Sequence, residues 1–446
     1  MTFPSHIFKA YDIRGKVNSE LTTMLCKNTG AATAQWLPTQ GIVAVGRDMR
    51  PDSKKLADAV IVGLRSQGRD VWDIGEVTSD MIYFAIGAYD LAGGIVVTAS
   101  HNAGDYNGIK IYRDKVTPVG LDSGLAEIRD LAEKNEFTPN KHTGSLMSKD
   151  ITKEWVQHAL STVHPETWPS FTVAIDAGNG MAGAILPSVL RKIPLQAEEM
   201  YFDLDGTFPN HEANPQDPKN LQDLIEKVKK NKYDFGIAFD GDGDRAGFVD
   251  DLGRPVLGTD LISIVSKMIL DEYPNSKIVH DVRTSRATKE LITEWGGEPV
   301  RTKAGRVYIG ALVRQVGAQF GGETTGHLFF KTNYDADSGL IAALYVIEAI
   351  ARSGKKLSEL VDEYRRYEMP AEMNFETDHK NEVFAKLCEH YSDWPQDKLD
   401  GLTVEADKFW FNLRASNTEP VIRLNIEAID KATLEAELST IKQIIA

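Results

Sequence analysis

The stretch Tyr233-Asp-Phe-Gly-Ile-Ala-Phe-Asp-Gly-Asp-Gly-Asp-Arg245 begins as an apolar, strand-like run and ends at three alternating acids, Asp240, Asp242 and Asp244. Glycines at 241 and 243 leave no side chain between the acids, so the loop can fold until their oxygens converge on one small divalent cation. Such an all-oxygen ligand set suits Mg²⁺. Arg245 adds a planar guanidinium, which suits a phosphate. The stretch therefore predicts a strand followed by a polar, exposed loop that binds a metal and a phosphate.

Two other interpretations of this loop remain open at the level of sequence. Alternating acids also occur in solvated turns after strands, where they bind nothing. A calcium EF-hand fits less well, because its loop requires Gly at the sixth position and Glu at the twelfth, where this chain has Arg245 and Asp251. The residues before the loop also predict a strand, whereas an EF-hand requires a helix there.

Length and composition predict a globular protein of several domains. At 446 residues the chain exceeds a single hydrophobic core, and the usual domain sizes predict about three or four domains. The net charge of −15 argues against nucleic acid as a partner, because a surface that follows phosphates is normally basic. Two distant cysteines, and the lack of an apolar signal or of any long apolar run, predict a reduced cytoplasmic protein that does not bind membranes.

Strand-like and helix-like segments alternate over most of the chain, which predicts parallel α/β packing. Three similar strand ends recur, at residues 43–48, 173–180 and 277–283. Each is followed by a helix and then by a second strand that leads into a polar, glycine-containing loop. These loops contain residues 100–102, 240–245 and 321–327. Open α/β sheets bind ligands at the carboxyl ends of their strands, so we expect each repeat to deliver one ligand-binding loop.

From about Tyr367 this alternation is lost. Residues 409–414 and 421–426 predict two antiparallel strands, followed by a terminal helix. We therefore expect an α/β protein with three related domains, whose sheets are mixed and largely parallel, and a smaller C-terminal α+β domain. The expected bounds of the four domains are 1–148, 149–252, 253–366 and 367–446.

The segment between the two C-terminal strands, Arg414-Ala-Ser-Asn-Thr-Glu-Pro420, offers a guanidinium, two hydroxyls and an amide. Together these groups could hold a phosphate. The same residues also fit an ordinary hairpin turn, so the sequence leaves both interpretations open.

Ser100 is the candidate nucleophile. It directly follows a buried strand, with His101 and Asn102 beside it and Lys110 a short loop away. A phosphoserine at this position could be held by these donors and bridged to a metal. Alternatively, the hydroxyl satisfies backbone groups of a turn. No Gly-x-Ser-x-Gly elbow surrounds Ser100, so the sequence does not indicate acyl transfer.

The segment Gly178-Asn-Gly-Met-Ala-Gly183 matches the G-x-G-x-x-G pattern of dinucleotide-binding turns. The acids Glu198, Glu199 and Asp203 follow about 20 residues later, as an NAD site requires. An alternative function is therefore that of an NAD-dependent oxidoreductase that uses Gly178, Gly180 and Gly183. Tight packing at a strand-to-helix turn would explain the same glycines without a cofactor.

In combination, these loops make the sequence similar to the α-D-phosphohexomutases, and within them to the phosphomannomutase/phosphoglucomutase branch. The resemblance covers essentially the whole chain, with its motifs in the same order. The motifs are Lys9-Ala-Tyr-Asp-Ile-Arg-Gly15, Thr98-Ala-Ser-His-Asn102 with Asp105-Tyr-Asn-Gly-Ile-Lys110, Asp240-Gly-Asp-Gly-Asp-Arg245, Gly322-Glu-Thr-Thr-Gly-His327 and Arg414-Ala-Ser-Asn-Thr-Glu-Pro420.

This resemblance implies four domains around a central cleft and an enzyme that interconverts hexose 1-phosphates and hexose 6-phosphates. It implies Ser100 carried as phosphoserine, hexose 1,6-bisphosphate as intermediate and activator, and Mg²⁺ held by Ser100, Asp240, Asp242 and Asp244. The catalytic residues that it implies are Ser100, Arg14, His101, Lys110 and Arg245. The substrate-binding residues that it implies are Tyr11, Arg283, Glu323, Thr325, His327, Arg414, Ser416, Asn417 and Thr418.

Two segments depart from the usual pattern of this branch. Thr324 and Thr325 replace the usual Met and Ser, which makes the preferred sugar less certain. Arg306 stands where His is common, and a guanidinium cannot act as a base near neutral pH. We therefore expect Arg306 to bind phosphate, and Lys110 or another nearby group to transfer the proton.

The resemblance favours phosphomannomutase activity, accompanied by phosphoglucomutase activity, and a phosphoglucosamine mutase is the nearest alternative. The expected partners are small sugar phosphates. The expected assembly is a monomer or a homodimer.

Overall fold

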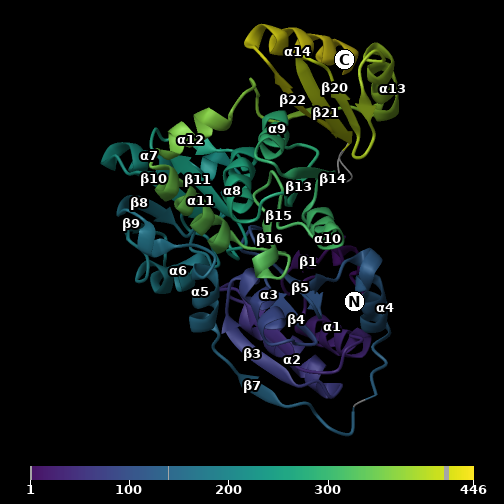
Figure 1. The fold of residues 1–446 in the computed structure, drawn as a ribbon. Helices are drawn as coiled ribbons and strands as arrows, with labels where there is room; N and C mark the ends of the chain where they lie inside the picture. The colour runs from purple at the N-terminus through teal and green to yellow at the C-terminus, as the bar shows by residue number, and fades with distance from the viewer. Residues whose placement is uncertain (1–2, 139, 416–420, 446) are drawn as a thin grey trace. The chain divides into compact units, whose positions relative to one another are not determined.

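The computed structural model describes residues 3–138, 140–415 and 421–445, and the chain divides into two compact units (Figure 1). Unit 1 contains Met1–Val256 and Gly326–Ser358. Unit 2 contains Leu257–Thr325 and Glu359–Ala446.

The first sheet of unit 1 has the strand order β1-β5-β4-β2-β3-β7, with β6 paired to β5. Strands β4, β2, β3 and β7 run parallel, and β5 lies antiparallel to both β4 and β1. The strands are β1 (Ile13–Lys16), β2 (Val43–Arg47), β3 (Val71–Glu76), β4 (Gly93–Val97), β5 (Tyr106–Arg113), β6 (Thr117–Pro118) and β7 (Leu146–Ser148).

Helices cover both faces of this sheet. Helices α1 (Thr23–Trp36), α2 (Ser53–Ser66) and α4 (Leu125–Lys134) share one apolar core with alternate residues of the strands, such as Ile95 and Ile111. Gly46 and Gly94 point to the other face, where a side chain would collide with Ile82 and Ile86 of α3 (Ser79–Ala88). Small residues on one face thus bring α3 close to the strands, and its first turn reaches the sheet edge where β4 ends.

The second sheet of unit 1 has the order β12-β11-β10-β8-β9. Strands β10, β8 and β9 are parallel, whereas β11 runs antiparallel to β10 and to β12. Leu224 and Val228 of the amphipathic helix α7 pack in a common core with Ala174, Ala238 and Val249 of the sheet. The strands are β8 (Phe171–Asp176), β9 (Leu195–Met200), β10 (Phe235–Phe239), β11 (Ala246–Asp250) and β12 (Pro255–Val256).

Unit 1 is completed by α5 (Thr152–Leu160), α6 (Ala182–Leu190), α7 (Gln222–Asn231), α11 (Gly339–Ser353) and the antiparallel pair β16 (Leu328–Phe330) and β17 (Ala336–Asp337).

Unit 2 contains a parallel layer in the order β14-β13-β15 and an antiparallel C-terminal sheet in the order β18-β22-β21-β20-β19. The parallel layer consists of β13 (Lys277–Asp281), β14 (Glu298–Thr302) and β15 (Phe320–Gly322), with helices α8 (Gly258–Glu272), α9 (Arg286–Glu294) and α10 (Arg306–Val316). Helix α12 (Leu357–Tyr364) begins at the end of unit 1 and continues into unit 2.

The C-terminal sheet packs on one side against α13 (Lys380–His390) and α14 (Lys431–Ile445), which share its apolar core. Leu387 and Ile441 of these helices lie in that core beside Phe411 and Leu424 of the central strands. The strands are β18 (Met373–Glu376), β19 (Gln396–Asp397), β20 (Leu402–Glu405), β21 (Phe409–Ala415) and β22 (Val421–Ala428).

One topology recurs three times. In each repeat the first strand lies between the second and the third, in the orders β4-β2-β3, β10-β8-β9 and β15-β13-β14. The polar, glycine-containing loop follows the third strand of each repeat. The expectation of a loop after the second strand was therefore wrong, because a whole extra helix-and-strand crossover separates the first strand from the neighbour that carries the loop.

The predicted fold class is confirmed: mixed α/β sheets are followed by a smaller antiparallel C-terminal sheet. In the first two sheets, the antiparallel strands β5 and β11 each follow a loop-bearing strand and run back beside it. Among the described residues, the longest apolar helices still fall short of what crossing a membrane would need.

The contact between α1 and α2 depends on glycine. A Cβ atom added to Gly63 would lie 2.0 Å from the carbonyl oxygen of Lys27. We expect Gly63→Ala to destabilise the protein by about 2 kcal/mol, because the overpacking exceeds the gain in helix propensity. The midpoint of urea unfolding, followed by circular dichroism, measures this. Val62→Ala, at a position 49% exposed on the same helix, is the control and should leave the midpoint nearly unchanged. A Gly63→Ala midpoint at or above that of the parent would contradict the close packing.

Candidate active site

Ser100 lies just beyond the end of β4 and is only 5% exposed. Its φ of +52° places a residue with a side chain in the left-handed region, a conformation that persists only where the surroundings enforce it. The Ser100 hydroxyl lies 3.1 Å from Oδ2 of Asp240 and 3.2 Å from Nδ1 of His101. The structure thus brings the candidate nucleophile to the acidic loop, as the sequence predicted.

Arg50 holds the Ser100 loop in this shape. Its side chain is buried, and it donates to the carbonyl oxygens of Ser100 at 2.8 Å and Asn102 at 2.6 Å. It also donates to the carbonyl oxygens of Ala103 and Tyr106, at 2.8 and 2.9 Å. The buried carboxylate of Asp48 accepts from its Nε at 3.2 Å. A guanidinium fork with four backbone acceptors fixes the path of the main chain on both sides of the nucleophile.

The three acids of the stretch that follows β10 are completely buried. Asp240, Asp242 and Asp244 are each 0% exposed, and each offers a carboxylate oxygen within 4.8 Å of the others. This corrects the expectation of an exposed loop. A Cβ atom at Gly241 would lie 2.5 Å from the carbonyl oxygen of Ser100, so this glycine lets the nucleophile loop pack directly onto the acidic loop.

Lys110 and Ser79 hold Asp242. The ammonium of Lys110 on β5 lies 2.6 Å from Oδ2 of Asp242 and 3.0 Å from Oδ2 of Asp244. The Ser79 hydroxyl, in the first turn of α3, donates to Oδ2 of Asp242 at 2.5 Å, and its N–H donates to the Asp242 carbonyl at 2.9 Å. Burial and the charge of Asp244 would raise the pKa of Asp242, but the Lys110 ammonium outweighs them and holds it below its ordinary value. Asp242 is therefore ionised near neutral pH.

The carboxylates of this cluster are suited to binding a cation. Burial, and then the nearby Asp244 carboxylate, raise the pKa of Asp240 well above its ordinary value despite the opposing Arg245. Oδ1 of Asp242 is buried and accepts no hydrogen bond from any described residue. A buried oxygen without a donor is costly unless a cation binds it. The residues present therefore fit a small divalent ion with oxygen ligands.

Arg245 and His101 complete the surroundings of Ser100. Nε of Arg245 donates to Oδ2 of Asp240 at 3.0 Å, and its Nη2 lies 2.9 Å from Nδ1 of His101. Burial, followed by the charges of Arg245 and Arg14, lowers the pKa of His101 to about 3. His101 is therefore neutral near pH 7, with Nδ1 as the acceptor for Arg245. Arg14 on β1 donates to Oδ1 of Asn102 at 2.6 Å, so it lies beside the same loop.

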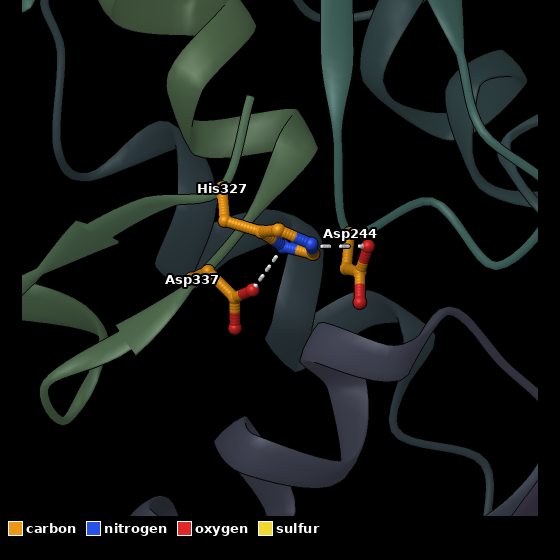
Figure 2. A group of neighbouring side chains, drawn as sticks. All are labelled: Asp244, His327 and Asp337. Atoms are coloured by element: carbon orange, nitrogen blue, oxygen red, sulfur yellow. Dashed lines mark hydrogen bonds and ion pairs between the residues drawn. The ribbon is translucent and has the colours of Figure 1, made fainter. Parts of the chain in front are cut away.

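His327 forms a pair with a buried acid next to this cluster. Its Nδ1 lies 2.7 Å from Oδ2 of Asp337 on β17 and 3.9 Å from Oδ1 of Asp244 (Figure 2). One atom of each residue lies within 4.8 Å of the others, a spacing that also suits a metal. Because Nδ1 is already bonded to Asp337, we interpret the arrangement as an imidazole oriented by a carboxylate.

In unit 2, the predicted site residues Arg283, Glu323 and Thr325 lie at the ends of neighbouring strands, and Arg414 and Arg306 lie on other elements. Arg283 donates to Glu323 at 2.9 Å, at the ends of β13 and β15, and Thr325 follows two residues later. Arg414 on β21 donates to Glu372 at 3.0 Å. Arg306 begins helix α10. Ser416, Asn417 and Thr418 lie outside the described residues. Tyr11, in unit 1, is 40% exposed.

Backbone atoms of the protein occupy the space beside the glycines of the dinucleotide-like motif. A Cβ atom at Gly183 would lie 2.2 Å from the carbonyl oxygen of Phe202, and one at Gly180 would lie 2.9 Å from that of Gly241. Gly178 has a φ of +54°. Backbone packing and turn geometry thus account for these residues, and they offer no open cradle for a pyrophosphate.

Arg50, Ser79 and Asp337 were not predicted as site residues. Arg50 follows the end of β2 by three residues, Ser79 is the first residue of α3 and Asp337 is the last residue of β17. The Asp48-x-Arg50 pair follows a buried strand, and a charged pair in that position could have been recognised as part of a site. Ser79 and Asp337 carry no comparable signal, because their partners are 163 and 10 residues away along the chain.

Comparisons with known proteins agree along the whole chain. Profiles described as phosphoglucomutase/phosphomannomutase alpha/beta/alpha domains I, II and III match residues 5–139, 153–253 and 258–367, and the C-terminal domain profile matches 372–443. The chain is 38% identical to phosphohexose mutases of Xanthomonas campestris pv. campestris over 449 residues, covering 100% of both chains. It is 35% identical to a phosphomannomutase of Methanocaldococcus jannaschii, covering 99% and 97% of the two chains.

A crystal structure of a phosphoglucomutase/phosphomannomutase family protein from Burkholderia thailandensis is similar in fold. The two sequences are 29% identical, and the structures match with a TM-score of 0.89 over 100% of this chain and 98% of that one.

The acidic cluster makes a prediction about metal binding. Asp242→Asn should weaken Mg²⁺ binding at least about tenfold, because a charged ligand is lost while the amide keeps the same size. Titration calorimetry measures the Kd directly. The matched control is Asp203→Asn, which removes the same charge at an exposed position of the same unit. An Asp242→Asn protein that is folded and binds Mg²⁺ as tightly as the control would refute the metal assignment.

Proposed function

Because this chain belongs to the phosphoglucomutase/phosphomannomutase family, we propose that it interconverts hexose 1-phosphates and hexose 6-phosphates, with mannose phosphates as the preferred substrates. Membership of the family makes it an intramolecular phosphotransferase, an isomerase. The single observation that best supports the proposed chemistry is the Ser100 hydroxyl, 3.1 Å from Asp240 and surrounded by buried carboxylates and cations.

The proposed reaction uses Ser100 as a phosphate carrier. In the first transfer the bond between Oγ of phosphorylated Ser100 and phosphorus breaks, and a new bond forms to a hydroxyl oxygen of the sugar phosphate. The hydroxyl proton passes to a base, and the product is hexose 1,6-bisphosphate. After the bisphosphate turns around, its other phosphoryl group returns to Oγ of Ser100, and the leaving sugar oxygen takes back a proton. Catalysis of this kind depends on positioning and on neutralising charge.

Asp240, Asp242, Asp244 and the phosphate of Ser100 are the proposed ligands of Mg²⁺. When bound, the ion would neutralise negative charge on the transferring phosphoryl group. Arg245 and Arg14 flank the Ser100 loop, so their guanidiniums are placed to bind the phosphoryl oxygens. Lys110 remains bonded to Asp242 and Asp244, and we assign to it the task of balancing their charge. An ammonium whose protons are donated to two carboxylates has no lone pair with which to accept a further proton.

We assign proton transfer to His327. Asp337 accepts the proton on Nδ1, which leaves Nε2 of the neutral imidazole as the atom that can take a proton from the sugar hydroxyl. A neutral imidazole has a nitrogen that can accept a proton, whereas a guanidinium has none. We therefore assign to His327 the proton transfer that Arg306 cannot perform.

Residues of unit 2 are proposed to bind the sugar and its second phosphate. Glu323 and Thr325 offer acceptors and donors to sugar hydroxyls. Arg283 and Arg306 offer guanidiniums to phosphate, and Arg414 begins the proposed distal phosphate loop together with Ser416, Asn417 and Thr418. The experiment that tests the function is to incubate the protein with mannose, glucose or glucosamine 1-phosphate, Mg²⁺ and a trace of hexose bisphosphate. Products identified by ³¹P NMR as 6-phosphates support the proposal, whereas free phosphate alone, or no product, refutes it.

The covalent step predicts a modified serine. Protein incubated with hexose 1,6-bisphosphate should gain the mass of one phosphate, located on the Ser100 peptide. Ser100→Ala should gain none and should lose activity by several orders of magnitude, because Ser100 supplies the hydroxyl that lies beside Asp240. Ser79→Ala serves as the comparison, since it removes a hydroxyl that contacts a different acid of the cluster, Asp242, but should leave Ser100 phosphorylated. If the unmutated protein carried the phosphate on a residue other than Ser100, this mechanism would be rejected.

Arg306 is predicted to be a phosphate ligand. Arg306→His should raise the KM for sugar phosphate more than it lowers kcat, since a contact made equally in the ground and transition states is lost. Steady-state kinetics of Arg306→His and Arg306→Ala measure this. Arg314→Ala, in the last turn of the same helix, is the control. Kinetics of both Arg306 variants that match those of the parent would mean that Arg306 does not contact the substrate.

A further inference from the structure

Asp281 is the centre of a buried hydrogen-bond cluster at the end of β13. Its carboxylate is 0% exposed and accepts from the N–H, Nε and Nη2 of Arg283, at 2.6, 3.1 and 2.8 Å. Burial would raise the pKa of Asp281, but Arg283 and the hydrogen bonds outweigh it and keep the pKa below its ordinary value. Asp281 is therefore charged near neutral pH, and its orientation fixes that of the guanidinium.

The same guanidinium continues to Glu323. Nη2 of Arg283 donates to Oε1 of Glu323 at 2.9 Å, and the Glu323 residue is only 6% exposed. A planar guanidinium held by one carboxylate leaves little freedom for a second carboxylate bound to the same nitrogen. The position of Glu323 therefore depends on the position of Asp281.

Thr324 is bonded to Asp281 twice. Its N–H donates to Oδ2 of Asp281 at 2.8 Å, and its hydroxyl donates to the same oxygen at 3.0 Å. The main chain at Thr324 is also pressed against the start of α8, where a Cβ atom at Gly258 would lie 2.0 Å from the Thr324 carbonyl oxygen. Main-chain contacts thus fix where Thr324 lies, and the hydroxyl adds a side-chain bond from Thr324 to Asp281.

We propose that Thr324 is a positioning residue for sugar binding, which acts through Asp281 and Arg283 to set the carboxylate of Glu323. The inference rests on the proposed function, since it assigns Oε2 of Glu323 to a sugar hydroxyl. Thr324 stands where methionine is usual in the related branch, and a thioether can donate no hydrogen bond to Asp281. The Thr324 hydroxyl therefore adds a hydrogen bond to Asp281 that a methionine could not make, and this bond helps to fix the loop that contains Glu323.

The test compares Thr324→Val with Thr324→Ser. Valine keeps the shape and removes the hydroxyl, whereas serine keeps the hydroxyl and removes the methyl group. Thr324→Val should raise the KM for mannose 1-phosphate and for glucose 1-phosphate by about three- to tenfold, with kcat changed less than about twofold, because a ground-state contact is loosened. Thr324→Ser should stay within about twofold of the parent in both parameters. Thr293→Val, at an exposed helix position in unit 2, controls for the loss of a hydroxyl as such.

The outcomes separate this inference from the proposed function. Equal KM values for parent and Thr324→Val, equal impairment of the valine and serine variants, or a fall in kcat at constant KM would each overturn the role of Thr324. Calorimetric Kd values for mannose 1-phosphate are measured in parallel. A parent that binds the sugar phosphate without isomerising it would reject the mutase function, and the Kd ratio of Thr324→Val to Thr324→Ser would then decide the positioning role. A parent that neither binds nor converts the sugar phosphate would overturn both.

Discussion

Three carboxylates buried in one loop impose a charge balance on the rest of unit 1. A carboxylate removed from water is costly unless a positive group lies beside it, and Asp240, Asp242 and Asp244 have no exposure at all. Lys110 and Arg245 meet part of this requirement from two different sheets. Burial and the neighbouring Asp244 carboxylate raise the pKa of Asp240, so a further positive charge beside the cluster would favour its ionised form. The proposed divalent ion and the proposed phosphate on Ser100 carry opposite charges, so each would offset the charge of the other.

The threefold recurrence of one strand order explains how the loops come to carry function. In every repeat the loop-bearing strand is the neighbour of the first strand, and in the first two repeats an antiparallel strand follows it. Such a position leaves the carboxyl end of the strand free of the crossover helices, so ligands can approach it. The chemistry of the repeats has nevertheless diverged, because one loop carries a serine, one carries three aspartates and one carries a glutamate with two threonines. Shared topology thus supplies the location, and local side chains supply the role.

The sequence predicted those parts of the structure that depend on local pattern. The alternation of strands and helices predicted the α/β repeats, and the spacing of Asp240, Asp242 and Asp244 predicted their convergence. It failed where distant contacts decide. The burial of the acidic loop follows from its packing against the Ser100 loop, and no pattern within residues 233–245 reveals that contact. The same reason applies to Arg50 and Ser79, whose partners Ser100 and Asp242 lie in loops that are distant along the chain.

The bonds made by Arg50 separate the placement of the nucleophile from the identity of its neighbours. Every acceptor that Arg50 uses in residues 100–106 is a main-chain carbonyl, so the clamp does not depend on which side chains the loop carries. Substitutions at Asn102 or Ala103 can therefore change what the loop offers to a ligand while Ser100 stays where it is. In evolutionary terms, the side chains of this loop are free to vary, because its main chain is held by Arg50, a residue outside the loop that follows β2.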